Sequence, residues 1–207
     1  LSEVVAVDAG MYHSLALKKD GSVWAWGVTL GDTYGIFKTP VRVVGASDVV
    51  AVSSGYSHSL ALRGDGRVLA WGPINSRGEL GNGTFTQTPP AVSEVAGLTD
   101  IVAISAGGYH SLALKRDGTV WAWGYNVFRQ LGDGTQMDQA TPVQVPGLSE
   151  VVAVSAGELH SLALQKDGTV WAWGDNSSGR LGDGTQEARA TAVKVAGLSG
   201  LTAISAG

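Results

Sequence analysis

One phrase occurs four times in this chain of 207 residues. It reads HSLALKKDGSVWAWG at 13–27, HSLALRGDGRVLAWG at 58–72, HSLALKRDGTVWAWG at 110–124 and HSLALQKDGTVWAWG at 160–174. The glycines three residues before each phrase, together with the last residue, are spaced by 45, 52, 50 and 50 residues. Such a period is the signature of a repeat architecture. We therefore predict a single repeat array with approximate units 1–48, 49–100, 101–150 and 151–200, and with 201–207 as the first strand of a further unit.

Each unit is predicted to be four short antiparallel strands. In HSLAL the leucines alternate with small or polar residues, and in VWAWG the tryptophans share one face while Val and Ala share the other. The Asp-Gly pair between them suits a two-residue hairpin turn. VVAVSAG and a TPVQV-like segment add two more strands. One such sheet cannot bury both faces, so the pattern predicts an all-β fold, a β-propeller of stacked four-stranded blades, with about four blades present.

The last copy, from Gly157 to Thr185, reads G-x-x-H-S-L-A-L-x-x-D-G-x-V-W-A-W-G-x-N-x-x-G-x-L-G-D-G-T. This series closely resembles the repeat of the regulator of chromosome condensation family, and the resemblance covers essentially the whole chain. It implies a propeller, seven-bladed in the best-known members, so four units amount to a partial ring. The first unit departs from the repeat, since VTLGDTYGIFKTP after Gly27 is five residues short and lacks LGDGT. We expect that loop to be remodelled.

The two ends of the chain repeat the same predicted strand, VVAVDAG and LTAISAG. A closed ring would instead join complementary strands, so we expect a fragment of a longer array with an open edge that must be paired or covered. Self-association is the alternative, with two copies forming a pseudo-ring of eight blades.

Composition argues against several classes of partner. The net charge is −4 without a run of Lys or Arg, so neither nucleic acid nor an anionic membrane is an expected partner. The chain has no cysteine, which excludes thiol catalysis and a Cys-ligated zinc. No apolar run reaches the roughly 20 residues of a membrane span. The compartment stays open, and the resemblance to secreted bacterial members favours a bacterial secreted or cell-surface protein.

The repeated polar and aromatic residues are predicted to be structural. His13, His58, His110 and His160 occupy equivalent places on stacked sheets about 10 Å apart, too far to share a metal ion bonded at about 2 Å. The serine after each histidine points to the opposite face of its strand, so no catalytic pair forms. We expect one structural hydrogen bond per blade from each histidine. Tryptophans are expected to fill the space between blades, namely Trp26, Trp71, Trp123 and Trp173.

No cofactor or metal is predicted. GDGT at 132–135 and 182–185 lacks the Gly-Lys-Ser/Thr of a phosphate-binding loop, and DNSSGRLGDG at 175–184 lacks the regular spacing of a calcium loop. In the family's plant ultraviolet-B photoreceptor the Gly-to-His stretch reads G-W-R-H. Here the tryptophan position holds Met11, Tyr56, Gly108 and Glu158, which does not support photoreception.

Candidate binding residues lie where the copies differ, because positions that repeat are explained by the blade. The two residues before each histidine and the loop after each WG are the divergent places, and Tyr and Arg are enriched at interface hot spots. The candidates are Tyr12, Tyr34, Phe37, Tyr56, Arg77, Tyr109, Tyr125, Phe128, Arg129 and Arg180.

The function predicted from these residues is a non-catalytic propeller scaffold that binds a protein through loops on one face. No acid, base or nucleophile constellation supports an enzyme. One alternative is the recognition part of a larger enzyme or signalling protein. Another, a guanine nucleotide exchange module like the founding family member, is disfavoured because no long insertion leaves a blade and no basic tail is present.

Overall fold

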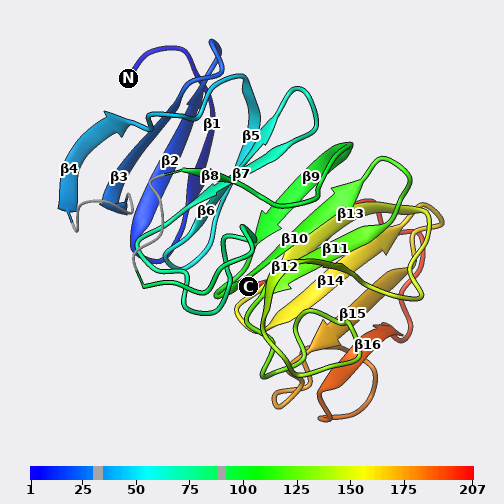
Figure 1. Ribbon diagram of the computed structural model, residues 1–207. Coiled ribbons are helices and arrows are strands. Elements are labelled where there is room, and N and C mark those ends of the chain that lie inside the picture. The colour runs from blue at the N-terminus through cyan, green and yellow to red at the C-terminus, as the bar shows by residue number, and fades with distance from the viewer. Residues whose placement is uncertain (30–34, 88–91) are drawn as a thin grey trace.

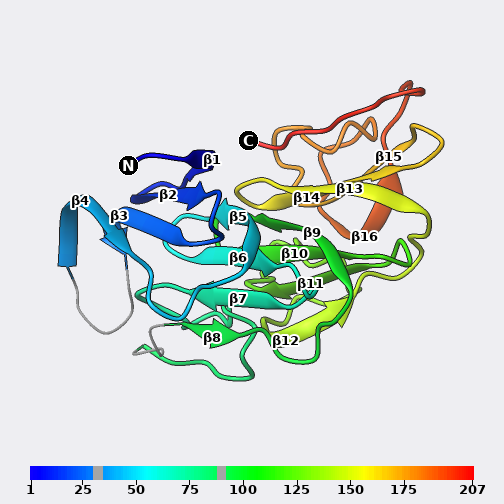
Figure 2. The same ribbon diagram turned by 90° about the horizontal axis from the view of Figure 1, so that it is seen from above.

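The computed structural model describes residues 1–29, 35–87 and 92–207 and confirms the all-β prediction. Sixteen strands in these residues form four antiparallel sheets of four strands each. The sheets follow one another in chain order around an arc, like the blades of a propeller (Figures 1 and 2). The described residues contain no helix that is long and apolar enough to cross a membrane.

Within each blade the strands pair in sequence order, so that the first strand is at one edge of the sheet and the fourth is at the other. Blade 1 contains β1 (Val4–Ala9), β2 (His13–Lys18), β3 (Val23–Thr29) and β4 (Gly35–Arg42). Blade 2 contains β5 (Val49–Ser54), β6 (Ser59–Arg63), β7 (Val68–Trp71) and β8 (Ser93–Glu94). Blade 3 contains β9 (Ile101–Ala106), β10 (His110–Lys115), β11 (Val120–Gly124) and β12 (Gln139–Gln144). Blade 4 contains β13 (Val151–Ala156), β14 (His160–Gln165), β15 (Val170–Gly174) and β16 (Arg189–Lys194).

The Asp-Gly turns differ from the predicted two-residue form. In blade 3 the N–H of Lys115 donates to the carbonyl of Thr119, and the N–H of Gly118 donates back to Lys115, so three residues form the loop. Gly118 has a φ of +81°, whereas Asp117 is not among the residues with positive φ. The Asp117 carboxylate instead accepts the N–H and the hydroxyl of Thr119, at 3.0 and 2.6 Å. This side-chain bond stabilises a turn in which only the glycine needs the left-handed region.

The hydrophobic core lies between the blades rather than inside any one of them. Three apolar clusters join successive blades, and each contains a tryptophan of the later blade packed on leucines of the earlier one. Trp71, Trp123 and Trp173 are at most 1% exposed in these clusters. Trp26 is only partly buried, because no blade of this chain lies on its side of blade 1.

A hydrogen-bonded histidine also links each blade to the next. Nε2 of His13 lies 2.8 Å from Oγ of Ser59, Nε2 of His58 lies 3.0 Å from Ser111, and Nε2 of His110 lies 2.9 Å from Ser161. The histidine therefore bonds the serine of the following blade and not its own sequence neighbour. The glycine three residues before the histidine makes room for this ring. In blade 3, a Cβ on Gly107 would lie only 2.5 Å from Cε1 of His110.

The loop between the third and fourth strands of the earlier blade supplies a backbone carbonyl that bonds the same serine. The carbonyl of Glu79 accepts the Ser111 hydroxyl at 3.1 Å and the Trp123 indole N–H at 2.9 Å. Because the hydroxyl has a single proton, Ser111 must accept from an Nε2–H of His58, which fixes the tautomer. Gln130 plays the same part for Ser161 and Trp173, at 2.8 and 2.9 Å.

Blade 1 differs from the other blades in the pairing of its third and fourth strands. Its third and fourth strands are joined as a longer hairpin, with Val28 opposite Ile36 and Thr29 opposite Gly35. The buried Nε1 of Trp71 has no hydrogen-bond partner among the described residues. Residues 30–34 of the loop that we expected to be remodelled lie outside the described residues, while Trp71 still packs with Leu15 and Leu17 of blade 1.

Residues 201–207 lie along blade 4 without forming a strand ladder. The N–H of Ala206 donates to Oγ of Ser155 at 2.9 Å, and the N–H of Glu158 donates to the carbonyl of Gly207 at 3.2 Å. The same bonds join β9 to β13, where the N–H of Ala156 donates to Oγ of Ser105 at 3.0 Å.

Candidate protein-binding face

The antiparallel order of the strands gathers the divergent segments on one face. The loop between the first and second strands and the loop between the third and fourth strands leave the same end of each sheet, while the Asp-Gly turns leave the other end. We call the end that carries Tyr56, Tyr109 and Tyr125 the loop face. Binding sites are commonly built from loops held on a rigid scaffold, as these are.

Four predicted residues form a continuous row on the loop face, which we call the aromatic row: Tyr56, Tyr109, Tyr125 and Phe128. Their ring centroids are 5.2, 6.1 and 6.0 Å apart in that order, and each contact is edge-to-face. Such geometry is the favoured one for aromatic pairs. Tyr109 is 38% exposed and Phe128 is 39% exposed, so the row presents apolar surface to solvent across blades 2 and 3.

Arg77 belongs to the same cluster. Its guanidinium carbon lies 5.0 Å from the centroid of the Tyr125 ring, within the range of a cation–π contact. The guanidinium also pairs with the carboxylate of Asp138 at 3.4 Å, which joins the loop of blade 2 to that of blade 3. Five of the predicted residues are therefore brought together by the fold.

The other predicted residues are placed apart from the aromatic row or are engaged elsewhere. Tyr12 is 53% exposed on blade 1, and Phe37 lies opposite Gly27 on β4, the outermost strand of blade 1. Arg129 donates to the carbonyl of Ala188 at 2.9 Å, which links blades 3 and 4. Arg180 pairs with Asp175 at 3.3 Å. Tyr34 lies outside the described residues.

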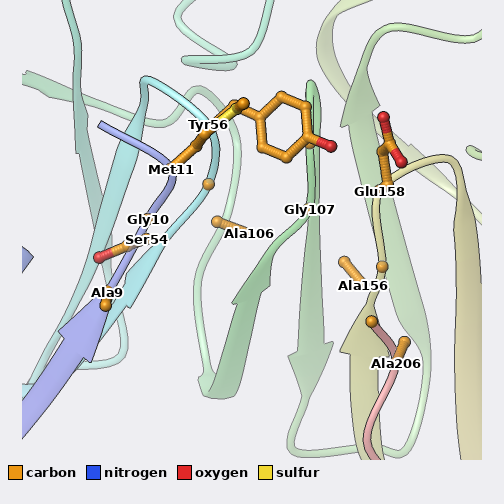
Figure 3. A pocket seen from close by; sticks show the side chains of 14 residues that line it. Ala9, Gly10, Met11, Ser54, Tyr56, Ala106, Gly107, Ala156, Glu158 and Ala206 are labelled. Atoms are coloured by element: carbon orange, nitrogen blue, oxygen red, sulfur yellow. The ribbon is translucent and has the colours of Figure 1, made fainter. Parts of the chain in front are cut away.

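A shallow funnel opens where the first strands of all four blades end. Its cavity of about 260 Å³ is lined mostly by glycine and alanine, with Met11, Tyr56 and Glu158 around it. Figure 3 shows the Tyr56 ring extending across the funnel toward Glu158. Desolvation is the main cause that raises the pKa of Tyr56 to about 12. The hydrogen bond with Glu158 and the negative charge of Glu158 raise it further. The funnel thus presents a neutral phenol and a carboxylate.

A second cavity, of about 290 Å³, lies between blades 2 and 3 beside the aromatic row. Arg77, Tyr109 and Tyr125 line it together with Glu79, an isoleucine and two serines. Glu79 is only 4% exposed, and one carboxylate oxygen accepts the N–H of Arg77 at 3.0 Å. Desolvation raises the pKa of Glu79 to about 7. Hydrogen bonds from the backbone N–H groups of Glu79 and Arg77, and the charge of Arg77, lower it by less.

The sequence analysis missed Glu79, although a signal for it was present. Aligning the copies on the leucine of G-x-L-G places Glu79, Gln130 and Arg180 at one position. The leucine beside each is fully buried, and Glu79 is itself buried whereas Arg180 is partly exposed, so a buried acid marks the blade 2–3 interface as different from its neighbour.

The buried histidines are held neutral by the fold. Desolvation lowers the pKa of His13 to about 4 and that of His58 and His110 to about 3, and it also lowers the pKa of His160. Their Nδ1 atoms are buried without a hydrogen-bond partner, so a proton gained there would find no acceptor. These rings fit a structural link better than a proton-transfer role.

The polar residues of the GDGT loops are satisfied by one another. Asp183 accepts the side-chain amide of Asn176, the N–H of Thr185 and the Nε–H of Arg189, at 3.1, 2.9 and 2.7 Å. Desolvation alone would raise the pKa of Asp183, but these hydrogen bonds together, that of Arg189 first, hold it well below its usual range. No group of three or more His, Cys, Asp or Glu that could hold a metal ion occurs within the described part of the chain.

Comparison with curated proteins gives relatives much longer than this chain. It is 34% identical over 147 residues to the ultraviolet-B receptor UVR8 of Arabidopsis thaliana, a match that covers 67% of this chain and 33% of that protein. It is 30% identical over 144 residues to the mitochondrial RCC1 domain-containing protein RUG3 of the same plant, covering 69% and 22%. The chain therefore spans a third or less of the length of these relatives.

Solved structures and a family model agree with the fold described above. Yeast RCC1 (Prp20), solved with Kap60 bound, superposes with a TM-score of 0.84 at 27% identity, over 98% of this chain and 52% of that one. Human WBSCR16 gives a TM-score of 0.81 at 28% identity, over 93% and 52%. The RCC1-like domain model matches residues 1–207. With its repeated blades, inter-blade histidines and buried tryptophans, this chain belongs to the RCC1-like domain family.

Proposed function

We propose that this chain is a non-catalytic recognition module that binds a protein partner through the aromatic row of its loop face. The observation that carries the proposal is the row itself, four rings in edge-to-face contact across two blades with Arg77 at its side. Aromatic residues and arginine are the types that dominate binding energy at protein interfaces.

The rest of the face supports this role. A rigid scaffold lowers the entropy lost on binding, and here the scaffold is fixed by three apolar clusters and by histidine links between blades. The related yeast RCC1 was solved with Kap60 bound, so a protein that contains a propeller of this kind does bind another protein. Because this chain spans about half of that propeller chain, it fits equally as the recognition part of a longer protein.

No specific observation favours the alternatives. The relative UVR8 is an ultraviolet-B receptor. In this chain the residue after the first glycine of each Gly-to-His stretch is Met11, Tyr56, Gly108 or Glu158, and none is a tryptophan. Nucleotide exchange, suggested by the founding family member, is supported by no feature of the loop face. Self-association through the outer faces of blades 1 and 4 stays a prediction.

The test compares two double variants of equal size. Tyr109→Ala/Phe128→Ala removes the two most exposed rings of the row, and Arg116→Ala/Lys166→Ala changes exposed residues at the Asp-Gly turns on the opposite face. Proteins captured by each immobilised chain are compared by quantitative mass spectrometry, and the affinity of each purified candidate is then measured by calorimetry. We expect a partner that binds the wild type and the turn variant alike but binds the row variant at least tenfold more weakly. Equal binding to all three chains would show that the loop face is the wrong face.

A further inference from the structure

We propose that the cavity between blades 2 and 3 receives a cationic side chain of the protein partner, the ammonium of a lysine or the guanidinium of an arginine, against the carboxylate of Glu79. The inference rests on the proposed function, since it names the chemistry that the loop face recognises. It is carried by the size of the cavity, by the charge at its base and by comparison with the neighbouring interface.

The cavity has room for one side chain rather than for a larger ligand. Its volume is about 290 Å³, at the lower end of the roughly 300–1,000 Å³ typical of small-molecule pockets. Tyr109 and Tyr125 form part of its lining, and both rings belong to the aromatic row. A residue projecting from a partner that covers the row would reach this cavity directly.

At pH values above about 7, Glu79 supplies a buried negative charge beside the cavity. The residue is only 4% exposed, and its carboxylate oxygen accepts the backbone N–H of Arg77, not the guanidinium. The guanidinium of Arg77 is occupied by Asp138 and by the Tyr125 ring. Among the described residues Glu79 forms no ion pair. A buried carboxylate without a counter-charge is unfavourable, so an incoming cation gains more here than it would at an exposed acid.

The neighbouring interface shows that the carboxylate is not needed for the fold. At the same position of blade 3, the side-chain oxygen of Gln130 accepts the N–H of Phe128 at 3.0 Å, as Glu79 accepts that of Arg77. Gln130 is also fully buried, and its carbonyl makes the same bonds to the next blade. A neutral amide thus performs the structural task, which leaves the charge of Glu79 available to a ligand.

The rings of the cavity favour a cation over an apolar side chain. A positive charge near the face of a tyrosine is attracted by the ring quadrupole, and the contact between Arg77 and Tyr125 shows such an arrangement in place at the rim. Two acidic groups, Glu79 and Asp138, stand beside the single resident cation Arg77. When Glu79 is ionised, the two carboxylates and one guanidinium leave a net negative charge that an incoming cation would balance.

The test uses three blocked amino acids as probes, Nα-acetyl-lysine, Nα-acetyl-arginine and Nα-acetyl-norleucine N-methylamides. Each is titrated at pH 8 into the ¹⁵N-labelled chain, and backbone amide shifts are followed by NMR. We expect saturable shifts at Arg77, Glu79, Tyr109 and Tyr125 with lysine or arginine, and no saturation with the uncharged norleucine. Glu79→Gln should weaken binding of the cations at least fivefold while keeping the rest of the spectrum. The relative strengths of the two cationic probes decide which side chain the cavity prefers.

Absence of saturation with both cations, or equal binding by Glu79→Gln, would overturn the inference. The outcome is separable from that of the proposed function. Partner binding lost in the aromatic-row variant but unchanged in Glu79→Gln would reject the cation cavity and keep the loop face as the binding surface. The opposite result is also informative. If the cations require Glu79 for binding but the partner binds the aromatic-row variant as well as the wild type, the cation cavity is supported and the proposed function is rejected.

Discussion

Glu79 at the interface of blades 2 and 3 and Gln130 at the interface of blades 3 and 4 occupy one position of the repeat. Both side chains accept a backbone N–H two residues earlier, and both carbonyls accept a serine hydroxyl and an indole N–H from the next blade. The charge differs, and Nε2 of Gln130 is buried without a hydrogen-bond partner among the described residues. The comparison separates what the repeat needs for stability, which both interfaces share, from what one interface adds, which is an ionisable group beside a cavity.

The largest effect should come from removing the tryptophans that the two interfaces share. Trp123→Ala and Trp173→Ala each delete a fully buried ring and its bond to the Glu79 or Gln130 carbonyl. We expect each to lower the free energy of unfolding by about 3–5 kcal/mol, measured by urea denaturation. The two losses should be similar, since the packing is equivalent. A large difference between the two would mean that the interfaces are not structural copies.

Exchanging the charge should have a smaller effect that depends on pH. The pKa of Glu79 is raised in the folded chain to about 7, so its favourable contribution is present at pH values below the unfolded pKa and is lost as the pH rises through 7. Glu79→Gln should therefore stabilise the chain at pH 8 by about 3 kcal/mol, at roughly 1.4 kcal/mol per unit of pKa shift, and by less than about 1 kcal/mol at pH 5. Gln130→Glu should destabilise it at pH 8 by a similar amount.

Titration of the histidines changes the stability of the chain with pH in the opposite direction. This change is the same in every variant compared, so it cancels in the difference between them. Their folded pKa values are lowered, so unfolded histidines bind protons first and stability falls as the pH drops below about 6.5. Because every variant contains the same four histidines, the difference between wild type and Glu79→Gln at each pH isolates the carboxylate. A difference that does not change between pH 5 and pH 8 would contradict a buried, charge-sensitive Glu79.

The two interfaces also show how far the sequence alone predicts the structure. The period of the repeat and the alternation within HSLAL and VWAWG predict the strands, their order and the tryptophan-filled interfaces, because each depends only on local pattern. The turn type was predicted wrongly, since Asp-Gly fits both a two-residue and a three-residue hairpin loop and the bond from Asp117 to Thr119 decides between them. Local pattern does not contain that choice.

The partner of each histidine could not be predicted for a different reason. His110 and Ser111 are neighbours on β10, and alternation sends their side chains to opposite faces. Which serine of which blade receives the imidazole depends on how the sheets are stacked, which no spacing in the chain records. Glu79 was missed because candidates were chosen by residue type among exposed loops, whereas its importance comes from burial. Arg129 was chosen on the same ground, and the fold commits its guanidinium to the carbonyl of Ala188.

The smallest expected effect tests whether the histidine link is equal at both interfaces. Ser111→Ala and Ser161→Ala each remove the acceptor of a buried Nε2–H, on His58 and His110 respectively. Each should lower the free energy of unfolding at pH 7.5 by about 1–2 kcal/mol, the typical range for leaving one buried donor unsatisfied. At the blade 2–3 interface the freed carbonyl belongs to Glu79, whose own carboxylate is unchanged, so the two losses should agree. If Ser111→Ala were much more damaging at pH 8 than at pH 5 while Ser161→Ala were not, the histidine link and the charge of Glu79 would be coupled, and the cavity would have to be treated as part of the blade interface and not as an addition to it.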